Sequence, residues 1–142
     1  MNTGRGRPRP RKGDHILLVD RCLAPEVAYE ICKLDGLHGI PLRDHYGDVT
    51  AQALEDITFL TEAGQRGWGV LTQNPRMWQV PQERACIIEN HVRVFSLDDP
   101  NASKTLKGIV LGRHLLSIRR RLRRPDPCSW RLRLQGVRKD LA

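Results

Sequence analysis

The sequence of 142 residues lacks the features that would place it in a membrane, in the secretory pathway or among zinc proteins. No apolar run approaches the roughly 20 residues that cross a bilayer, and the basic N-terminus is followed by no apolar segment of a secretory signal. None of its four cysteines (Cys22, Cys32, Cys86, Cys128) forms a Cys-x-x-Cys pair. We therefore expect reduced thiols in a cytoplasmic protein that binds no zinc and no membrane.

Two families of sites are also disfavoured by what is missing. A Gly-x-Gly-x-x-Gly turn between a strand and a helix would indicate a dinucleotide site, but Gly64-Gln-Arg-Gly67 leads from a helix into a strand. A Rossmann-type small-molecule domain is therefore the weakest interpretation. No serine stands in a nucleophile-elbow context, and neither His45 nor His91 has a partner at metal or triad spacing.

The positive charge is concentrated at the two ends of the chain. The formal net charge is +8, of which residues 1–14 carry +4 and residues 113–142 carry +8, whereas residues 15–112 carry −4. Basic segments hold phosphate backbones by releasing counterions, and an acidic centre suits a cation. Solvated basic tails remain the simpler alternative, but the combination favours a polyanionic partner.

Apolar patterning predicts strands that alternate with helices. Strands are expected at residues 16–20, 39–43, 68–72, 92–95 and 130–134, the last as an edge strand. Helices are expected at 25–34, 51–63, 85–88 and 101–123, with Asp99 capping the last, and residues 44–48 are expected to form a loop. This alternation predicts a three-layer α/β/α fold with a short, mainly parallel sheet, a long C-terminal helix and a basic tail. We expect a disordered arm at residues 1–14, one domain at 15–124 and a basic extension at 125–142.

Polar side chains at strand ends and on one helix provide candidate metal ligands. Asp20 ends the first strand, Asn74 follows the third, and Asp56 borders the predicted apolar face that contains Ile57 and Leu60. Ligands gather at the carboxyl edge of open α/β sheets, and Mg²⁺ or Mn²⁺ prefers oxygen ligands. These positions therefore predict a site for a hard cation.

Each candidate has a structural alternative. Asp20 could instead cap the helix that begins near Pro25, and Asn74 could cap a short helix that begins at Pro75. Asp56 could be a solvated acid on a helix surface. Glu55 could take the place of Asp56, and Asp98 is a spare candidate ligand.

Over residues 15–98 the chain resembles PIN-like domains of the VapC class of toxin ribonucleases. The resemblance rests on three segments: Leu17-Leu-Val-Asp20-Arg21, Asp56-Ile-Thr-Phe-Leu60 with Ala63-Gly64, and Gly67-Trp-Gly-Val-Leu-Thr72-Gln-Asn74-Pro-Arg76. It implies a ribonuclease in which acids bind Mg²⁺ or Mn²⁺ to activate water for RNA cleavage.

Carried over by position, the resemblance makes Asp20, Asp56 and Asn74 the metal-binding and catalytic residues, with Thr72 orienting the site. It implies phosphate contacts from Arg21 and Arg76. The basic helix with Arg119, Arg120 and Arg123 lies outside the matched part, and we expect it to hold RNA or an acidic antitoxin. The sequence does not decide whether the protein forms a homodimer.

Asn74 stands where the family usually has its third Asp, and an amide lowers the negative charge of the site. The alternative is therefore a catalytically degenerate PIN-like module that binds nucleic acid or a partner protein.

Overall fold

A single mostly parallel sheet organises the protein. The computed structural model describes residues 8–99 and 102–142, and its strand order is β2-β1-β3-β4-β5-β6. Strands β1 to β5 are parallel, and β6 pairs antiparallel with β5. The strand bounds are β1 His15–Val19, β2 Leu37–Pro41, β3 Gly69–Thr72, β4 Arg93–Leu97, β5 Cys128–Arg133 and β6 Gly136–Leu141. Across the two described ranges, no helix combines the length and apolar character needed to cross a bilayer.

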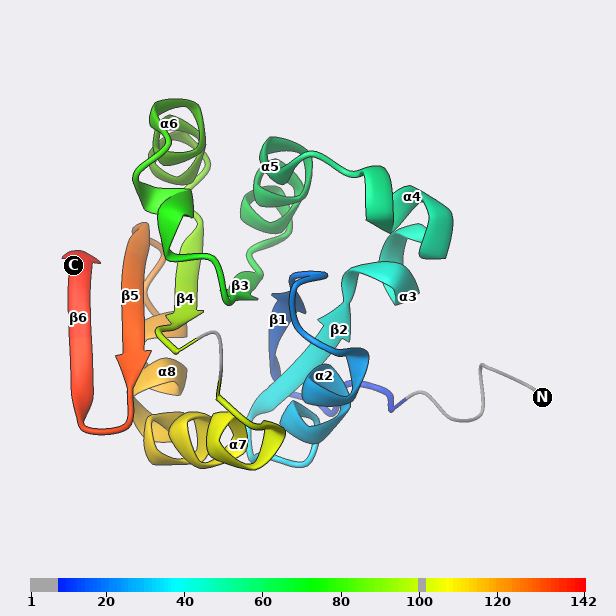
Figure 1. The fold of residues 1–142 in the computed structure, drawn as a ribbon, viewed down its shortest axis with the longest axis vertical. Helices are drawn as coiled ribbons and strands as arrows, with labels where there is room; N and C mark the ends of the chain where they lie inside the picture. The colour runs from blue at the N-terminus through cyan, green and yellow to red at the C-terminus, as the bar shows by residue number, and fades with distance from the viewer. Residues whose placement is uncertain (1–7, 100–101) are drawn as a thin grey trace.

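Helices cover both faces of this sheet, which confirms the predicted three-layer α/β/α architecture. Figure 1 shows α2, α7 and α8 on one side and α5 and α6 on the other, with α3 and α4 beyond β2. The helix bounds are α2 Pro25–Ile31, α3 Leu42–Tyr46, α4 Asp48–Ala53, α5 Asp56–Arg66, the 3₁₀ helix η1 Pro75–Trp78, α6 Pro81–Glu89, α7 Lys104–Arg113 and α8 Leu115–Leu122.

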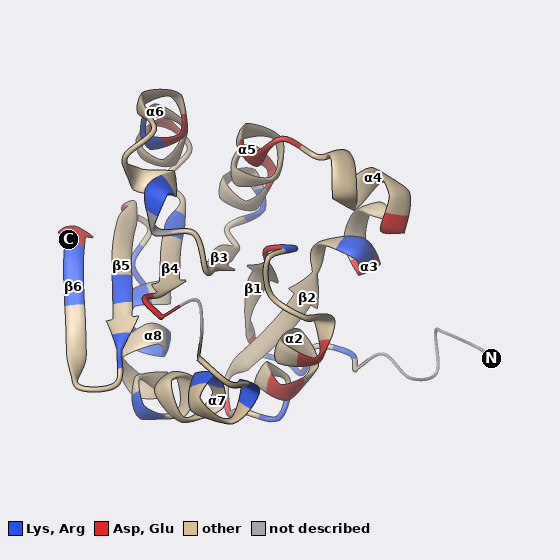
Figure 2. Ribbon diagram, viewed as in Figure 1, with Lys and Arg blue, Asp and Glu red and all other residues tan. Residues whose placement is uncertain are grey.

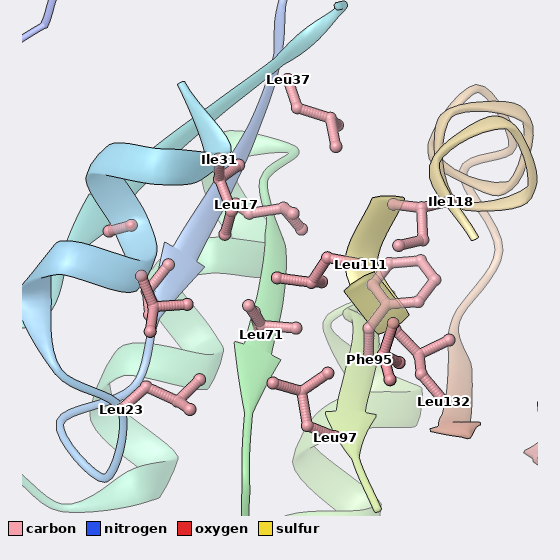
Figure 3. Packing of buried hydrophobic residues seen from close by; sticks show 14 of the residues in the cluster. Leu17, Leu23, Ile31, Leu37, Leu71, Phe95, Leu97, Leu111, Ile118 and Leu132 are labelled. Carbon is pink, nitrogen blue, oxygen red and sulfur yellow. The ribbon is translucent and has the colours of Figure 1, made fainter. Parts of the chain in front are cut away.

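Alternation along the strands divides the core into two clusters. Leu17 and Val19 of β1 pack with α2, α7 and α8, whereas Leu18 between them packs with α5 and α6. In Figure 3, Leu71, Phe95 and other side chains of the first cluster point toward one another between sheet and helices. Both faces of β1, β3 and β4 are therefore buried, as expected for central parallel strands.

The predicted helix at 51–63 is wrong in one respect, because the structure has two helices there. Leu54 and Glu55 have extended backbone angles, so α4 ends at Ala53 and α5 begins at Asp56. This break turns Ile57 outward, where it is 39% exposed, while Leu60 stays buried. Asp56 thus occupies the first turn of a helix, where the helix dipole favours a carboxylate.

The C-terminal part differs more from the sequence prediction. The expected helix at 101–123 is divided at His114 into α7 and α8, and its cap is Ser103, whose hydroxyl accepts a hydrogen bond from Leu106 N, rather than Asp99. The predicted edge strand at 130–134 is β5, an inner strand, because the unpredicted β6 pairs with it. The expected loop at 44–48 is mostly helix α3.

The predicted disorder of the N-terminal arm falls partly on residues 1–7, which lie outside the described residues. Residues 8–14 follow a course fixed by Arg11, whose guanidinium Nη2 donates to the carbonyl oxygens of Leu34 and Leu37 at 2.8 and 3.0 Å. The arm therefore lies where β2 begins.

A charged hydrogen-bond network anchors α5 to α3. Glu62 accepts from the Tyr46 hydroxyl, from His45 Nε2 at 2.9 Å and from Arg66 Nε at 2.8 Å. These bonds, led by that from Tyr46, lower the pKa of Glu62 to about 2. Because α5 begins at Asp56, the network also fixes the helix that carries a candidate site residue.

Glu62→Gln is expected to lower the free energy of unfolding at neutral pH by about 2 kcal/mol, the order of one charged hydrogen bond. The folded-state pKa lies below the ordinary value of 4.5, so this contribution is present above pH 4.5 and is lost as pH falls toward about 2. Urea denaturation of wild type and variant should show a difference that shrinks over that range. Glu55→Gln, at an exposed position just before the same helix, is the control; a difference that is independent of pH contradicts the assignment.

Candidate functional site

The carboxyl ends of β1 and β3 meet at the point where the strand order reverses. The chain passes from β1 to β2 on one side and later returns to β3 on the other, so a crevice opens between β1 and β3. Asp20 follows β1 directly and is 4% exposed, and Thr72 is the last residue of β3 and fully buried. The Thr72 hydroxyl donates to Asp20 Oδ2 at 2.8 Å, which fixes the carboxylate across the crevice.

Two helix N-termini carry further carboxylates to this crevice. Asp56 is the first residue of α5, and Glu83 lies in the first turn of α6. The two helices pack side by side, with Thr61 Oγ1 of α5 lying 3.2 Å from Cys86 Sγ of α6. Figure 2 shows acidic residues in the segment after β1 and at the start of α5. The N-terminal ends of α5 and α6 stabilise negative charge there.

The three carboxyl groups interact electrostatically. Burial raises the pKa of Asp20, and the charge of Asp56 raises it further, against the opposing hydrogen bond from Thr72. Burial, hydrogen bonding to Asp56 and the charges of Asp56 and Asp20 raise the pKa of Glu83 to about 7. Asp20 and Asp56 thus lie close enough to repel each other, and Glu83 joins them.

Arg21 connects the first two acids. Its main-chain N–H donates to Asp20 Oδ1 at 2.7 Å, and its Nη2 lies 3.7 Å from Asp56 Oδ1. The side chain is 39% exposed, so this ion pair faces solvent at the mouth of the site. A cation already neutralises part of the charge of Asp56.

Asn74 uses its side chain as a helix cap. Its Oδ1 accepts from Arg76 N at 3.1 Å and begins η1, and its own N–H donates to Thr72 Oγ1 at 3.0 Å. The prediction that Asn74 caps a short helix beginning at Pro75 is confirmed. The metal-ligand role stays a prediction, since an amide oxygen has a second lone pair.

The carboxylate oxygens are donors of the kind that a hard divalent cation prefers. One oxygen of Glu83, Oε1, is buried without a hydrogen-bond partner, and a cation would both satisfy it and offset the mutual repulsion of Asp20, Asp56 and Glu83. In the described part of the chain, no three His, Cys, Asp or Glu side chains are already gathered closely enough to hold an ion. A cation shared by all three carboxylates would therefore require them to move closer together.

The predicted phosphate contacts fall into two groups. Arg21 lies beside Asp56, and the exposed Arg76 belongs to η1, which follows Asn74. Arg119 lies against Gly36, just before β2 begins, and Arg123 lowers the pKa of His15 at the start of β1. The arginines of α8 are thus at the amino edge of the sheet, away from the acids.

Of the other candidates, Asp98 is paired with Arg133 Nε at 2.5 Å, and Glu55 is exposed just before α5. Sequence reasoning missed Glu83. The available signal was Pro81, which occupies the first position of α6 and places an acid two residues later in the first helical turn. The sequence interpretation instead began this helix at residue 85 and left Glu83 outside it.

Comparison with known families identifies the chain's relationship. A family model described as a PIN-like domain matches residues 16–99, a range that contains β2 to β4, all of β1 except His15, and the three acids. Neither a curated protein nor a solved structure matches the chain.

Proposed function

The chain belongs to the PIN-like domain family, a nuclease-type superfamily, and from this we propose that it is a metal-dependent endoribonuclease that hydrolyses RNA phosphodiester bonds. The observation that carries the proposal is the convergence of Asp20, Asp56 and Glu83 at the reversal point of the sheet, with one buried Glu83 oxygen unsatisfied. Carboxylates that repel one another in a crevice are typical of a site that takes a cation.

Mg²⁺ or Mn²⁺ would be held by Asp20, Asp56 and Glu83, with Asn74 at the margin of the set. The bound ion would supply Lewis-acid stabilisation of charge that develops on the phosphodiester. Thr72 holds Asp20 in place through its 2.8 Å hydrogen bond and is therefore a positioning residue. Arg21, which is paired with Asp56, and the exposed Arg76 of η1 would contact phosphates of the RNA.

The test is cleavage of a single-stranded RNA by the purified protein. Cleavage is expected with Mg²⁺ or Mn²⁺ and is expected to stop with a chelator, because the carboxylates alone offer no electrophile. In parallel, calorimetry with Mn²⁺ should show binding that Asp56→Asn weakens about 10- to 100-fold, the usual cost of disturbing a metal site. Cleavage that continues undiminished in the presence of chelator contradicts the proposal.

The same proposal includes a role as the toxin of a toxin–antitoxin pair, with an antitoxin protein as partner. Support comes from the sequence resemblance to VapC-class ribonucleases at Asp20, Asp56 and Thr72. Overproduction of the protein should arrest growth, and Asp20→Ala should relieve the arrest. Arrest that is equally strong with Asp20→Ala contradicts this part of the proposal.

A catalytically silent PIN-like module is the second candidate, and the position of Arg21 favours it. A guanidinium 3.7 Å from Asp56 already offsets charge that a cation would otherwise neutralise. RNA binding that weakens with salt, together with no heat of Mn²⁺ binding, would select this function.

A further inference from the structure

The two basic ends of the sequence meet at the amino edge of the sheet. Arg11 of the N-terminal arm donates to the carbonyl oxygens of Leu34 and Leu37. Arg119 of α8 lies against Gly36 between them, where a Cβ would come within 2.5 Å of Arg119 Nε. Segments more than 100 residues apart in the sequence thus flank one turn.

The arginines of α8 have no acidic partners there. Over the residues that the structure describes, the ion pairs involve other cations and none involves Arg119, Arg120 or Arg123. The nearby Asp14 and Asp126 are paired with Arg11 and Arg124. Asp35, the acid next to Gly36, also forms none of these ion pairs, so no ion pair within the described residues offsets the charge of Arg119, Arg120 or Arg123.

The excess of positive charge acts on the pKa of His15, at the start of β1. Burial lowers its pKa, and the charges of Arg123, Arg93 and Arg119 lower it further, although Asp14 acts in the opposite direction. Cations from β4 and α8 therefore act on one point at this edge.

A hollow of about 520 Å³ opens beside this charge, lined by residues that include Gly64, Gly67, His91, Arg93 and Arg123. Arg93 is only 6% exposed, and its guanidinium donates to the carbonyl oxygens of Leu122, Arg124 and Gly67, while its Nε is buried without a partner. Because these partners are neutral carbonyl oxygens, no anion offsets the positive charge of the Arg93 guanidinium.

We propose that this amino-edge surface, formed by Arg119, Arg120, Arg123 and the arm around Arg11, binds the phosphate backbone of an RNA strand at a distance from the acidic site. The inference rests on the proposed function and deepens it by naming an extended RNA as the substrate. Planar guanidinium groups pair with phosphate oxygens in a bidentate manner, and the regularly spaced charges of a nucleic acid suit several separated cations.

The separation of the two surfaces sets a minimum substrate length. Strand β1 has five residues between the arginine edge and Asp20, a span of about 17 Å at roughly 3.3 Å per residue. At about 3.4 Å per stacked nucleotide, on the order of five nucleotides separate the cleaved bond from this surface. A stacked RNA shorter than this reaches one of the two surfaces but not both.

The test uses Arg120→Gln/Arg123→Gln, two exposed positions on and just after α8. The matched control, Arg113→Gln/Arg138→Gln, removes the same charge from exposed positions on α7 and β6. Binding of a long single-stranded RNA is measured by fluorescence anisotropy against salt, with a chelator present. The slope of log affinity against log salt should fall by about 1.4 in the test variant, the value for two phosphate contacts on a single strand. The control should keep the wild-type slope.

Equal slopes for the test and control variants would overturn the inference. Displacement of RNA by polyglutamate at matched charge, with tighter binding of the polyglutamate, would also overturn it and would make an acidic protein the partner. Since binding is measured without metal, this result is independent of catalysis. A wild-type protein that cuts no RNA but shows the slope difference refutes the ribonuclease proposal and retains the RNA surface.

Discussion

Glu83→Gln and Asp20→Asn are each expected to lower the kcat for RNA cleavage by about 100-fold or more, the order of loss for one preorganised electrostatic group in an active site. Both changes keep the size of the side chain and replace a carboxyl group that can ionise to hold a cation with a neutral amide. Asp20 is fixed by Thr72, and Glu83 has the buried unsatisfied oxygen that a cation would occupy. The two residues are therefore expected to act on the same ion.

The matched control for Glu83→Gln is Glu89→Gln, which removes an exposed carboxylate from the other end of α6. It should leave both cleavage and Mn²⁺ affinity unchanged. Circular dichroism and the urea midpoint establish that each variant is folded. Wild-type cleavage by the Asp20→Asn/Asp56→Asn double variant would mean that these acids are not the site.

Phe95→Ala is expected to lower the free energy of unfolding by about 3–5 kcal/mol. Phe95 is fully buried on the central strand β4, and its ring meets that of Trp130 edge to face at 5.7 Å between centroids. It packs between the sheet and the layer formed by α2, α7 and α8, so its removal leaves a cavity where these elements meet. The measurement is urea denaturation at neutral pH, read from the midpoint at unchanged slope.

Leu116→Ala on α8 is the control for this prediction, because Leu116 is 67% exposed. Its effect should stay within about 0.5 kcal/mol, as is usual for surface positions. A loss at Phe95 no larger than that at Leu116 would show that β4 is not packed as described.

The sequence by itself determined the inner strands and the layer architecture. Continuous apolar runs such as Leu17-Leu-Val can be buried on both faces, and the helical spacing between them requires crossover connections. It also indicated that Asp20 ends the first strand and that Asn74 caps a short helix, because both features depend on residues within a short distance along the chain. Signals of this kind depend on residues that are close together in the chain, so they can be recognised from the sequence alone.

The interruptions of the helices were harder to predict. The apolar spacing continues through Leu54 and through His114, so periodicity alone gives one helix where the structure has two. In each case the backbone angles change at a residue that the apolar spacing does not mark. The pairing of β5 was missed for a similar reason, since it depends on the return of β6.

Only the tertiary structure decided which charges act together. Glu83 joins Asp20 and Asp56 because α5 and α6 pack in parallel with their first turns at the same edge, and no spacing in the sequence encodes that arrangement. The two basic ends are far apart along the chain. They meet beside Gly36 because β1 and α8 both have an end at the amino edge. Local patterns fix the elements, whereas the separation of acids from arginines follows from the direction in which parallel strands run.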